Sequence, residues 1–347
     1  MRRLLFFFCL LTVAGLAHSA PWSLHIDDIR ISPPVTSRSL AIYPLRVGGE
    51  SSPRCRSLDA ALMQKVLSIE ETSESGDVNR LRLRNRGDLP VFIMAGEVLS
   101  GARQDRILQH DLWLEADSEP VIVSAFCVEH GRWGYKQGKG RVFESKSTLG
   151  NLKVRRAAMS EGGQQAVWES VDETNRSAGV HSPTQTLNAA YFDPKVSSAL
   201  ELLEDRLRDL PEEYPEVNGV AVQIGNRIVA VDVFPDRRIF RSLWPKLLRS
   251  YAMEAQVARL DLEALDRQKV RDFLGEVAAA DAVSKDNPGE GRLYSLDHSG
   301  LRGEALVLSG ELVHLQALSR EKPRKVPHPS PSPWPPAIEM MKPTRPR

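Results

Sequence analysis

Residues 91–114 read VFIMAGEVLSGARQDRILQHDLWL, and their pattern predicts two core strands joined by a charged turn. The run VFIM and the alternating run ILQHDLWL are typical of buried strands. Between them, GEVLSGARQDR (96–106) carries two carboxylates, an amide and two guanidinium groups. Gly96 and Gly101 suit a turn that needs a positive φ or a close approach to a ligand. This stretch indicates either a functional loop or a solvated turn with ordinary ion pairs.

Strand patterns continue on both sides of this stretch. We expect strands in residues 24–31, 40–47, 66–71, 78–85, 90–96, 105–116 and 119–129. The segment SPPVTSRS (32–39) should break the chain between the first two strands, because it is rich in proline and serine. SLDAALMQKV (57–66) predicts a helix, with Ser57 as its N-cap.

The C-terminal half predicts helices and two hairpins. Residues 134–192 are polar, with weak helical periodicity in 151–159 and 164–171. Asp193 and Pro194 should begin a helix whose buried face carries Val196, Leu200, Leu203 and Leu207. We also expect hairpins in 219–234 and 301–318, a helix from about 239 to 251 that Pro245 kinks or divides, and another in 261–279.

Strands in blocks, rather than in strict βαβ alternation, indicate an α+β fold with a mixed or antiparallel sheet. We predict one domain over 21–319, with a β-rich part at about 24–133 and a part with helices and hairpins at about 134–319. The 41% hydrophobic and 26% charged residues of the 347 are typical of a globular chain.

The charges of the chain are balanced. Lys and Arg total 46, and Asp and Glu total 45. Such a balance gives no long-range field to gather nucleic acid or an anionic membrane surface. We therefore predict no nucleic-acid partner, and any recognition of an anion must be local.

Residues 1–20 have the pattern of a signal peptide. Arg2 and Arg3 precede an apolar run from Leu4 to about Leu16, and the small residues of AHSA follow. The run is too short to span a bilayer core of ~30 Å. We expect cleavage within AHSA, export to the periplasm or the medium, and no transmembrane segment in the mature protein.

Residues 320–347 predict a disordered tail. The last 27 residues hold nine of the 23 prolines, together with lysines and arginines and few aliphatic residues. Such a segment cannot bury enough apolar surface to fold. It either extends the domain as a solubilising segment or contacts an envelope surface.

Two cysteines remain beyond the predicted signal peptide, Cys55 and Cys127. An exported protein with two thiols permits one disulfide. Cys127 lies in the apolar run VIVSAFCVE, which favours a buried free thiol instead.

CVEHGRW (127–133) is the second candidate for a functional segment. Alternation places Glu129 at the end of an apolar row, where a carboxyl group can have a raised pKa and act as a base, or can hold an arginine. Arg132 and Trp133 offer anion binding and stacking, although Trp133 could equally belong to the core.

Four further polar residues lie within predicted strands. His110 shares an alternation face with leucines, which favours a core histidine, and Asp111 lies on the other face. We expect Asp232 and His314 on the solvated faces of their hairpins. No HxH, HExxH or CxxC spacing occurs, so the sequence predicts no metal and no cofactor.

Taken together, these segments resemble the ARPP domain family, a protein domain associated with ADP-ribosylglycohydrolases and the rhodanese and phosphatase superfamily. The resemblance covers about residues 25–318 and depends on GE followed by GxxQxR, and then on CVExGRW. It carries over these candidate residues: Glu97, Gly101, Gln104, Arg106, Glu129, Gly131, Arg132 and Trp133. Asp105 stands where the family pattern has asparagine.

The resemblance implies a link to NAD and ADP-ribose metabolism. Our first hypothesis is a site for a small anionic ligand, held by Arg106 and Arg132 and stacked on Trp133. Glu97 or Glu129 would then act as acid or base in a hydrolysis. The alternative is a non-catalytic binding or envelope scaffold protein, in which the same charges form a buried ion-pair network.

Overall fold

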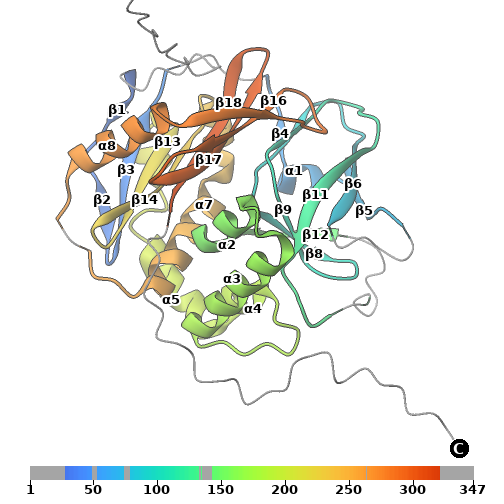
Figure 1. Ribbon diagram of the computed structural model, residues 1–347, viewed down its shortest axis with the longest axis horizontal. Coiled ribbons are helices and arrows are strands. Elements are labelled where there is room, and N and C mark those ends of the chain that lie inside the picture. Colours follow the sequence, from blue (N-terminus) through green and yellow to red (C-terminus); the bar gives the residue numbers. More distant parts are fainter. Residues whose placement is uncertain are drawn as a thin grey trace, which may run out of the picture.

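The fold is α+β, as predicted, with a β-rich N-terminal half (Figure 1). The computed structural model describes residues 28–48, 53–73, 79–132, 134, 143–262 and 264–320. The predicted signal peptide, Trp133 and the tail beyond residue 320 lie outside the described residues. Within the described ranges, no helix has the length and apolar character to cross a membrane.

A nine-stranded antiparallel sheet forms one half of the described structure. Its order is β1 (Arg30–Ile31), β3 (Leu40–Arg46), β13 (Gly219–Ile224), β14 (Arg227–Val233), β18 (Glu311–Ser319), β17 (Leu301–Leu308), β16 (Arg292–Asp297) and β15 (Asp281–Lys285), with β2 (Val35–Ser37) paired to β3. The predicted hairpins are β13–β14 and β17–β18.

Both faces of this sheet are covered, which explains why its strands are apolar on both sides. Leu40 and Ile42 of β3 pack into the core that contains α7 (Arg237–Ala258). The alternate residues Ala41 and Tyr43 pack into the core that contains α8 (Arg267–Ala278). Figure 1 shows α8 lying across the outer face of the sheet.

The N-terminal half contains two smaller sheets. The six-stranded sheet has the order β12 (Phe143–Leu149), β8 (Glu97–Gly101), β9 (Arg106–Leu108), β11 (Val121–Cys127), β6 (Arg80–Asn85) and β5 (Leu67–Glu71). The three-stranded sheet has the order β10 (Leu112–Leu114), β7 (Val91–Ile93) and β4 (Arg56–Ser57), and β4 pairs with β7 in parallel. The described strands therefore include antiparallel and parallel pairs.

The helices fill the space beside and between the sheets. Besides α7 and α8 they are α1 (Leu58–Met63), α2 (Leu152–Met159), α3 (Gly163–Ala178), α4 (Leu187–Phe192), α5 (Pro194–Glu204) and α6 (Leu210–Glu213). One core combines Phe92 and Trp113 of the β-rich half with Leu200 of α5 and Leu247 of α7. This shared core fixes the two halves against each other.

Several sequence predictions were wrong in detail. Residues 97–101 are not part of a turn but form the buried strand β8, so the turn covers only 102–105. The single strand expected in 105–116 is divided into β9 and β10, which belong to different sheets. The predicted breaker at 32–39 contains β2, and the sequence patterns missed β12, α4 and the β15–β16 hairpin. In β8 the polar residues are buried with partners, which a hydrophobic pattern does not reveal.

The helix predictions agree better with the structure than the strand predictions do. Ser57 caps α1 by accepting from the N–H of Ala60, as expected. Pro245 lies inside α7, but the helix is not divided. The helix expected in 261–279 begins only at Arg267, where Asp266 caps it.

Asp193 caps α5 through its carboxylate, which accepts from the N–H groups of Lys195 and Val196. We expect Asp193→Ala to lower the free energy of unfolding by about 1 kcal/mol, because two N–H groups of the first turn lose their acceptor. Equilibrium urea denaturation measures the change. Asp205→Ala at the other end of the same helix is the matched control, and a similar loss in both variants would contradict a capping role.

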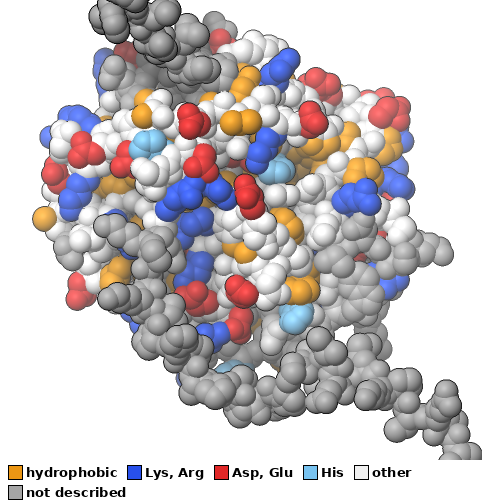
Figure 2. Space-filling view, in the orientation of Figure 1, with side chains coloured by type: hydrophobic (Ala, Val, Ile, Leu, Met, Phe, Trp, Pro, Cys, Tyr) orange, Lys and Arg blue, Asp and Glu red, His pale blue; other side chains and the backbone are white. Residues whose placement is uncertain are grey.

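Charges of both signs share the visible surface. In Figure 2, acidic and basic side chains are interspersed over most of the face shown, and basic side chains gather in a short stripe near its centre. This distribution agrees with the formal net charge of +1.

Candidate functional site

The two charged motifs predicted from the sequence lie against each other. Arg132 donates to Glu129 at 2.6 Å and to the carbonyl oxygens of Gly101 and Ala102 at 3.2 and 2.8 Å. The N–H of Asp105 donates to the Glu129 carboxylate at 3.0 Å. Strand β11 pairs with β9, and Cys127 lies opposite Arg106. The second motif therefore begins beside the last residue of the first motif. In this arrangement Glu129 holds an arginine.

Asp105 accepts hydrogen bonds from several directions. Its carboxylate is 1% exposed and accepts from the hydroxyl groups of Ser100 at 3.0 Å and Thr186 at 2.9 Å. It also accepts from the amide of Asn188 at 3.0 Å and from the N–H of Gly101 at 3.1 Å. A carboxylate can accept all of these bonds, whereas an asparagine would present one NH₂ group to the donors. The aspartate at this position therefore joins the motif to α4.

Gly131 and Trp133 are the two other candidate residues of the second motif. Gly131 donates its N–H to the carbonyl oxygen of Thr184, and a Cβ atom there would lie 2.9 Å from the carbonyl oxygen of Pro183. A side chain at Gly131 would therefore push this loop away. Trp133 is outside the described residues, so its predicted stacking role stays a prediction.

Arg106 is fully buried between the two motifs. It donates to Gln104 at 3.1 Å and lies 3.6 Å from Glu71, whose side chain is 1% exposed. Gln104 in turn donates to the carbonyl oxygen of Glu129 at 3.1 Å. Burial lowers the pKa of Arg106, and Glu71 opposes this effect. In this conformation the guanidinium group has no route to a ligand in solvent.

Glu97 belongs to a different cluster, formed with α7. It is 0% exposed and pairs with Lys246, and its second oxygen accepts from the N–H of Met94 at 2.8 Å. Burial raises the pKa of Glu97, and Lys246 opposes this rise. Both of its oxygens are occupied, and neither Glu97 nor Glu129 faces solvent. Their predicted acid and base roles stay predictions.

Lys246 connects this buried pair to a cavity. Its ammonium group lies 2.8 Å from Asp59, whose side chain is 31% exposed. Burial by itself lowers the pKa of Lys246, but Glu97 and Asp59 offset this and raise it. Asp59 also accepts from the hydroxyl groups of Ser145 and, at 2.7 Å, Ser147. Burial by itself raises the pKa of Asp59. Lys246 and the two hydroxyl groups outweigh this effect, so the pKa lies below the ordinary value.

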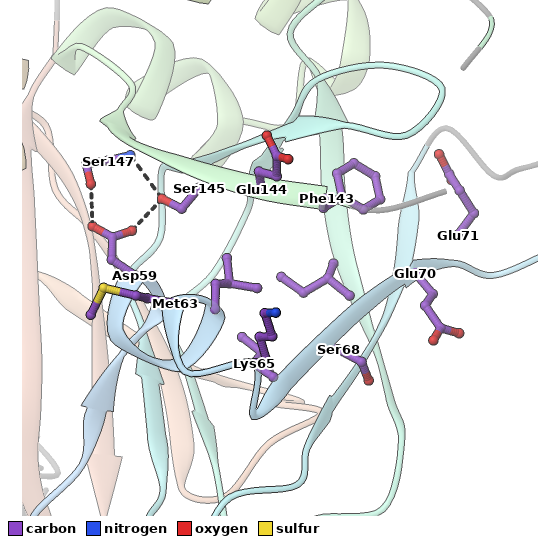
Figure 3. A pocket seen from close by; sticks show the side chains of 13 residues that line it. Asp59, Met63, Lys65, Ser68, Glu70, Glu71, Phe143, Glu144, Ser145 and Ser147 are labelled. Carbon is purple, nitrogen blue, oxygen red and sulfur yellow. Dashed lines mark hydrogen bonds between the residues drawn. The ribbon is translucent and has the colours of Figure 1, made fainter. Parts of the chain in front are cut away.

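The cavity beside Asp59 has a volume of about 990 Å³. Figure 3 shows Ser145 and Ser147 directed toward Asp59 at one end, and Phe143 and Glu71 at the other. It lies between α1, β5 and β12, and these residues line it: Asp59, Leu62, Met63, Lys65, Leu67, Ser68, Ile69, Glu70, Glu71, Phe143, Glu144, Ser145 and Ser147. The site thus has an apolar body and a polar end.

Sequence reasoning missed Lys246, Asp59 and the two serines as a group. Asp59 lies within SLDAAL, whose pattern predicts only a helix. Lys246 follows Ile239 by seven residues, which places both on nearly the same side of an α-helix. Because Ile239 is buried, a lysine at this position should have been recognised as a buried charge that needs a partner.

A second buried network corrects two further predictions. Asp232 and His314 do not lie on solvated faces; both side chains are 0% exposed. Asp232 pairs with Arg155 at 2.6 Å and accepts from Tyr251 at 2.6 Å. His314 lies 3.4 Å from Asp232 and 2.6 Å from Asp111, which is also fully buried. The two hairpins are covered on both faces, so their polar residues have to find partners inside.

Gly96 makes room for this network. It has a φ of +92°, as the sequence suggested, and a Cβ atom there would lie 2.7 Å from the Cγ atom of Arg155. His110, expected in the core, is only partly buried and pairs with Glu304 at 2.6 Å. Glu304 also accepts from the N–H of Asp111 at 3.1 Å, so the network extends from α2 to a histidine near the surface.

The described cysteines are free thiols, with Cys127 buried and Cys55 partly exposed. Among the described residues, no group of three or more His, Cys, Asp or Glu side chains could hold a metal ion.

The chain was compared with protein-family models, curated proteins and solved structures. The family model ARPP-1, the ARG and Rhodanese-Phosphatase-superfamily-associated Protein domain, matches residues 28–318. No curated protein and no solved structure matches significantly.

Proposed function

Since the chain belongs to the ARPP-1 family over nearly all of its described residues, we propose that it is a non-catalytic binding domain of that family. The ligand is a small molecule that enters the cavity beside Asp59. It donates hydrogen bonds at its polar end, as a ribose or another sugar does. The observation that carries the proposal is the arrangement of Ser145 and Ser147 around Asp59.

The polar end of the cavity accepts hydrogen bonds. Ser145 and Ser147 both use their hydroxyl protons on the Asp59 carboxylate. The Ser145 oxygen already accepts from the N–H of Ser147 at 3.0 Å, so the Ser147 oxygen is the more available acceptor at this end. Asp59 has a lowered pKa and stays ionised at neutral pH, where it cannot donate. A ligand group placed here must therefore donate, which favours a hydroxyl or amine and disfavours a phosphate or carboxylate.

The charges of the lining point the same way. Four carboxylates line the cavity, those of Asp59, Glu70, Glu71 and Glu144, together with the ammonium group of Lys65. Two of the carboxylates have a buried cation behind them, Lys246 at 2.8 Å from Asp59 and Arg106 at 3.6 Å from Glu71, so the negative excess is small. The resemblance to the family implied a nucleotide or ADP-ribose ligand. A nucleoside meets this cavity through its ribose hydroxyl groups, whereas each added phosphate meets mostly negative charge.

The remaining surface of the cavity suits the apolar part of such a ligand. Leu62, Leu67, Ile69 and Phe143 line it. A volume of about 990 Å³ is at the upper end of the range for small-molecule sites. A base or another flat apolar group can pack on these side chains while the hydroxyl groups reach Asp59.

Binding without turnover follows from the burial of the predicted acid and base. Glu97 is held by Lys246, and Glu129 by Arg132. A general acid or base has to reach the proton that it transfers, directly or through one water. The same carboxylates instead fix buried structure, as in our second hypothesis: Glu97 ties β8, which pairs with β12, to α7, and Glu129 ties Arg132 to the N–H of Asp105.

The test is a binding series that varies charge on a fixed sugar. We expect adenosine to bind more tightly than AMP, and AMP more tightly than ADP, by isothermal titration calorimetry at constant ionic strength. Product analysis by chromatography should show every ligand unchanged. Tighter binding of ADP than of adenosine, hydrolysis of either, or no binding at millimolar concentration would overturn the proposal.

A matched pair of serine variants locates the site. We expect Ser147→Ala to weaken adenosine binding about tenfold, since it removes an acceptor worth about 1 kcal/mol or more. Ser68→Ala removes a hydroxyl group from the same cavity but away from Asp59, and should leave affinity within twofold. Equal effects of both variants would contradict the proposed orientation of the ligand.

A further inference from the structure

A second cavity, of about 280 Å³, lies between the start of α1 and the start of α7. We propose that this cavity binds a small oxyanion, an inorganic phosphate or the phosphate group of a monoester. It is separate in chemistry from the cavity beside Asp59. The proposal does not depend on the function proposed for that cavity.

Three arginines line the second cavity, Arg54, Arg56 and Arg238. Arg56 is fixed in place, because its Nε donates to Gln64 and its Nη2 donates to Asp88, both at 2.7 Å. Its Nη1 atom is buried and has no hydrogen-bond partner. Arg54 has no side-chain partner among the described residues. A fixed guanidinium group with a remaining donor is well suited to an oxyanion.

The negative charge on this lining comes from one carboxylate, which already pairs with an arginine. Asp236 is the carboxylate on this lining, and it is 1% exposed. It accepts from the N–H of Arg238 as the N-cap of α7 and pairs with the Arg238 side chain at 2.5 Å. Asp236 on the lining and Asp88 beside Arg56 therefore offset two of the three guanidinium groups, and the cavity keeps an excess of one positive charge.

One hydroxyl group on this lining belongs to Ser57 and accepts a hydrogen bond, whereas Ser145 and Ser147 donate theirs to Asp59. Ser57 uses its oxygen to accept from the N–H of Ala60 as the N-cap of α1. Its proton remains available to donate. Arginine and hydroxyl donors thus converge on one cavity, which favours an acceptor-rich ligand.

The size of the cavity restricts the ligand further. Binding sites for drug-sized molecules start at about 300 Å³, and this cavity lies just below that range. It accommodates a phosphate or sulfate group, with the rest of a monoester in solvent, but not a whole nucleotide.

Cys55 lies on the lining and serves as a reporter. Burial, and then the nearby Asp236, raise the pKa of its thiol to about 12, so its alkylation is slow and sensitive to local access. We expect 10 mM inorganic phosphate to slow iodoacetamide labelling of Cys55 at least fivefold, followed by mass spectrometry of its peptide. Glycerol 3-phosphate should protect similarly, and sodium chloride at matched ionic strength should not. Equal protection by chloride would overturn the proposal.

Arginine variants decide whether the cavity is responsible. Arg54→Gln and Arg56→Gln should each weaken phosphate binding about tenfold, measured from the concentration dependence of Cys55 protection. Arg271→Gln, on the exposed face of α8, removes the same charge away from the cavity and should change nothing. An equal loss of protection in all three variants, or no loss in any, would overturn the proposal. Failure of adenosine to bind the other cavity would leave these outcomes unaffected.

Discussion

Arg155→Met should lower the free energy of unfolding by about 3–5 kcal/mol, the range for breaking a buried ion pair from one side. Arg155 is 1% exposed and donates to Asp232 at 2.6 Å and to Gln316 at 2.9 Å. Without it, Asp232 keeps its charge in the core with only Tyr251 and His314 as partners. Equilibrium unfolding in guanidinium chloride, followed by tryptophan fluorescence, measures the loss.

The matched control is Arg176→Met, in an exposed pair with Asp172 on α3. Exposed pairs at i,i+4 contribute only about 0.3–0.5 kcal/mol, so this variant should unfold at nearly the wild-type denaturant concentration. A double-mutant cycle with Asp232→Asn should show strong coupling, because the second substitution removes the charge that the first leaves unpaired. A loss below about 1 kcal/mol for Arg155→Met would mean that Arg155 contributes little to the fold.

The sequence could predict the hairpins around this network but not what their polar residues face. Asp232 and Gln316 lie opposite each other in the β14–β18 register, and His314 follows the same alternation in β18. A hairpin with alternating polar residues normally has one solvated face, which is why these residues were assigned to solvent. In this sheet that face is covered by α7, whose Tyr251 reaches Asp232.

The charged motif shows a different limit. Its composition correctly identified residues that lie together, since Asp105, Glu129 and Arg132 are in contact. It did not reveal that the motif is buried, because residues 97–101 have no long apolar run and were assigned to a turn. Partners that bury these charges come from distant segments, such as Lys246 on α7 and Asn188 on α4. Local patterns contain no information on such contacts.

The stability of the protein should fall between pH 6.5 and pH 9 because of His314. Burial by itself lowers the pKa of His314, but Asp111 and Asp232 outweigh it and raise the pKa from 6.5 to about 9. A raised pKa in the folded state gives a stabilisation that is complete below the unfolded value and is lost as the pH rises through the folded value. The shift corresponds to a loss on the order of 3 kcal/mol. Urea denaturation at intervals across this range measures it.

His314→Gln should remove most of this slope. The variant is less stable than wild type at pH 6, because Asp111 and Asp232 lose a cation, and the difference should shrink toward pH 9 as wild-type His314 loses its proton. His298→Gln, at a partly exposed histidine near Glu276, is the control and should keep the wild-type slope. Asp232 itself does not contribute in this window: burial raises its pKa, but Arg155 and His314 outweigh this and hold it well below the usual range, so its stabilisation is lost only in acid. A wild-type slope that persists in His314→Gln would show that His314 is neutral in the folded protein, and that Asp111 and Asp232 are balanced by Arg155 alone.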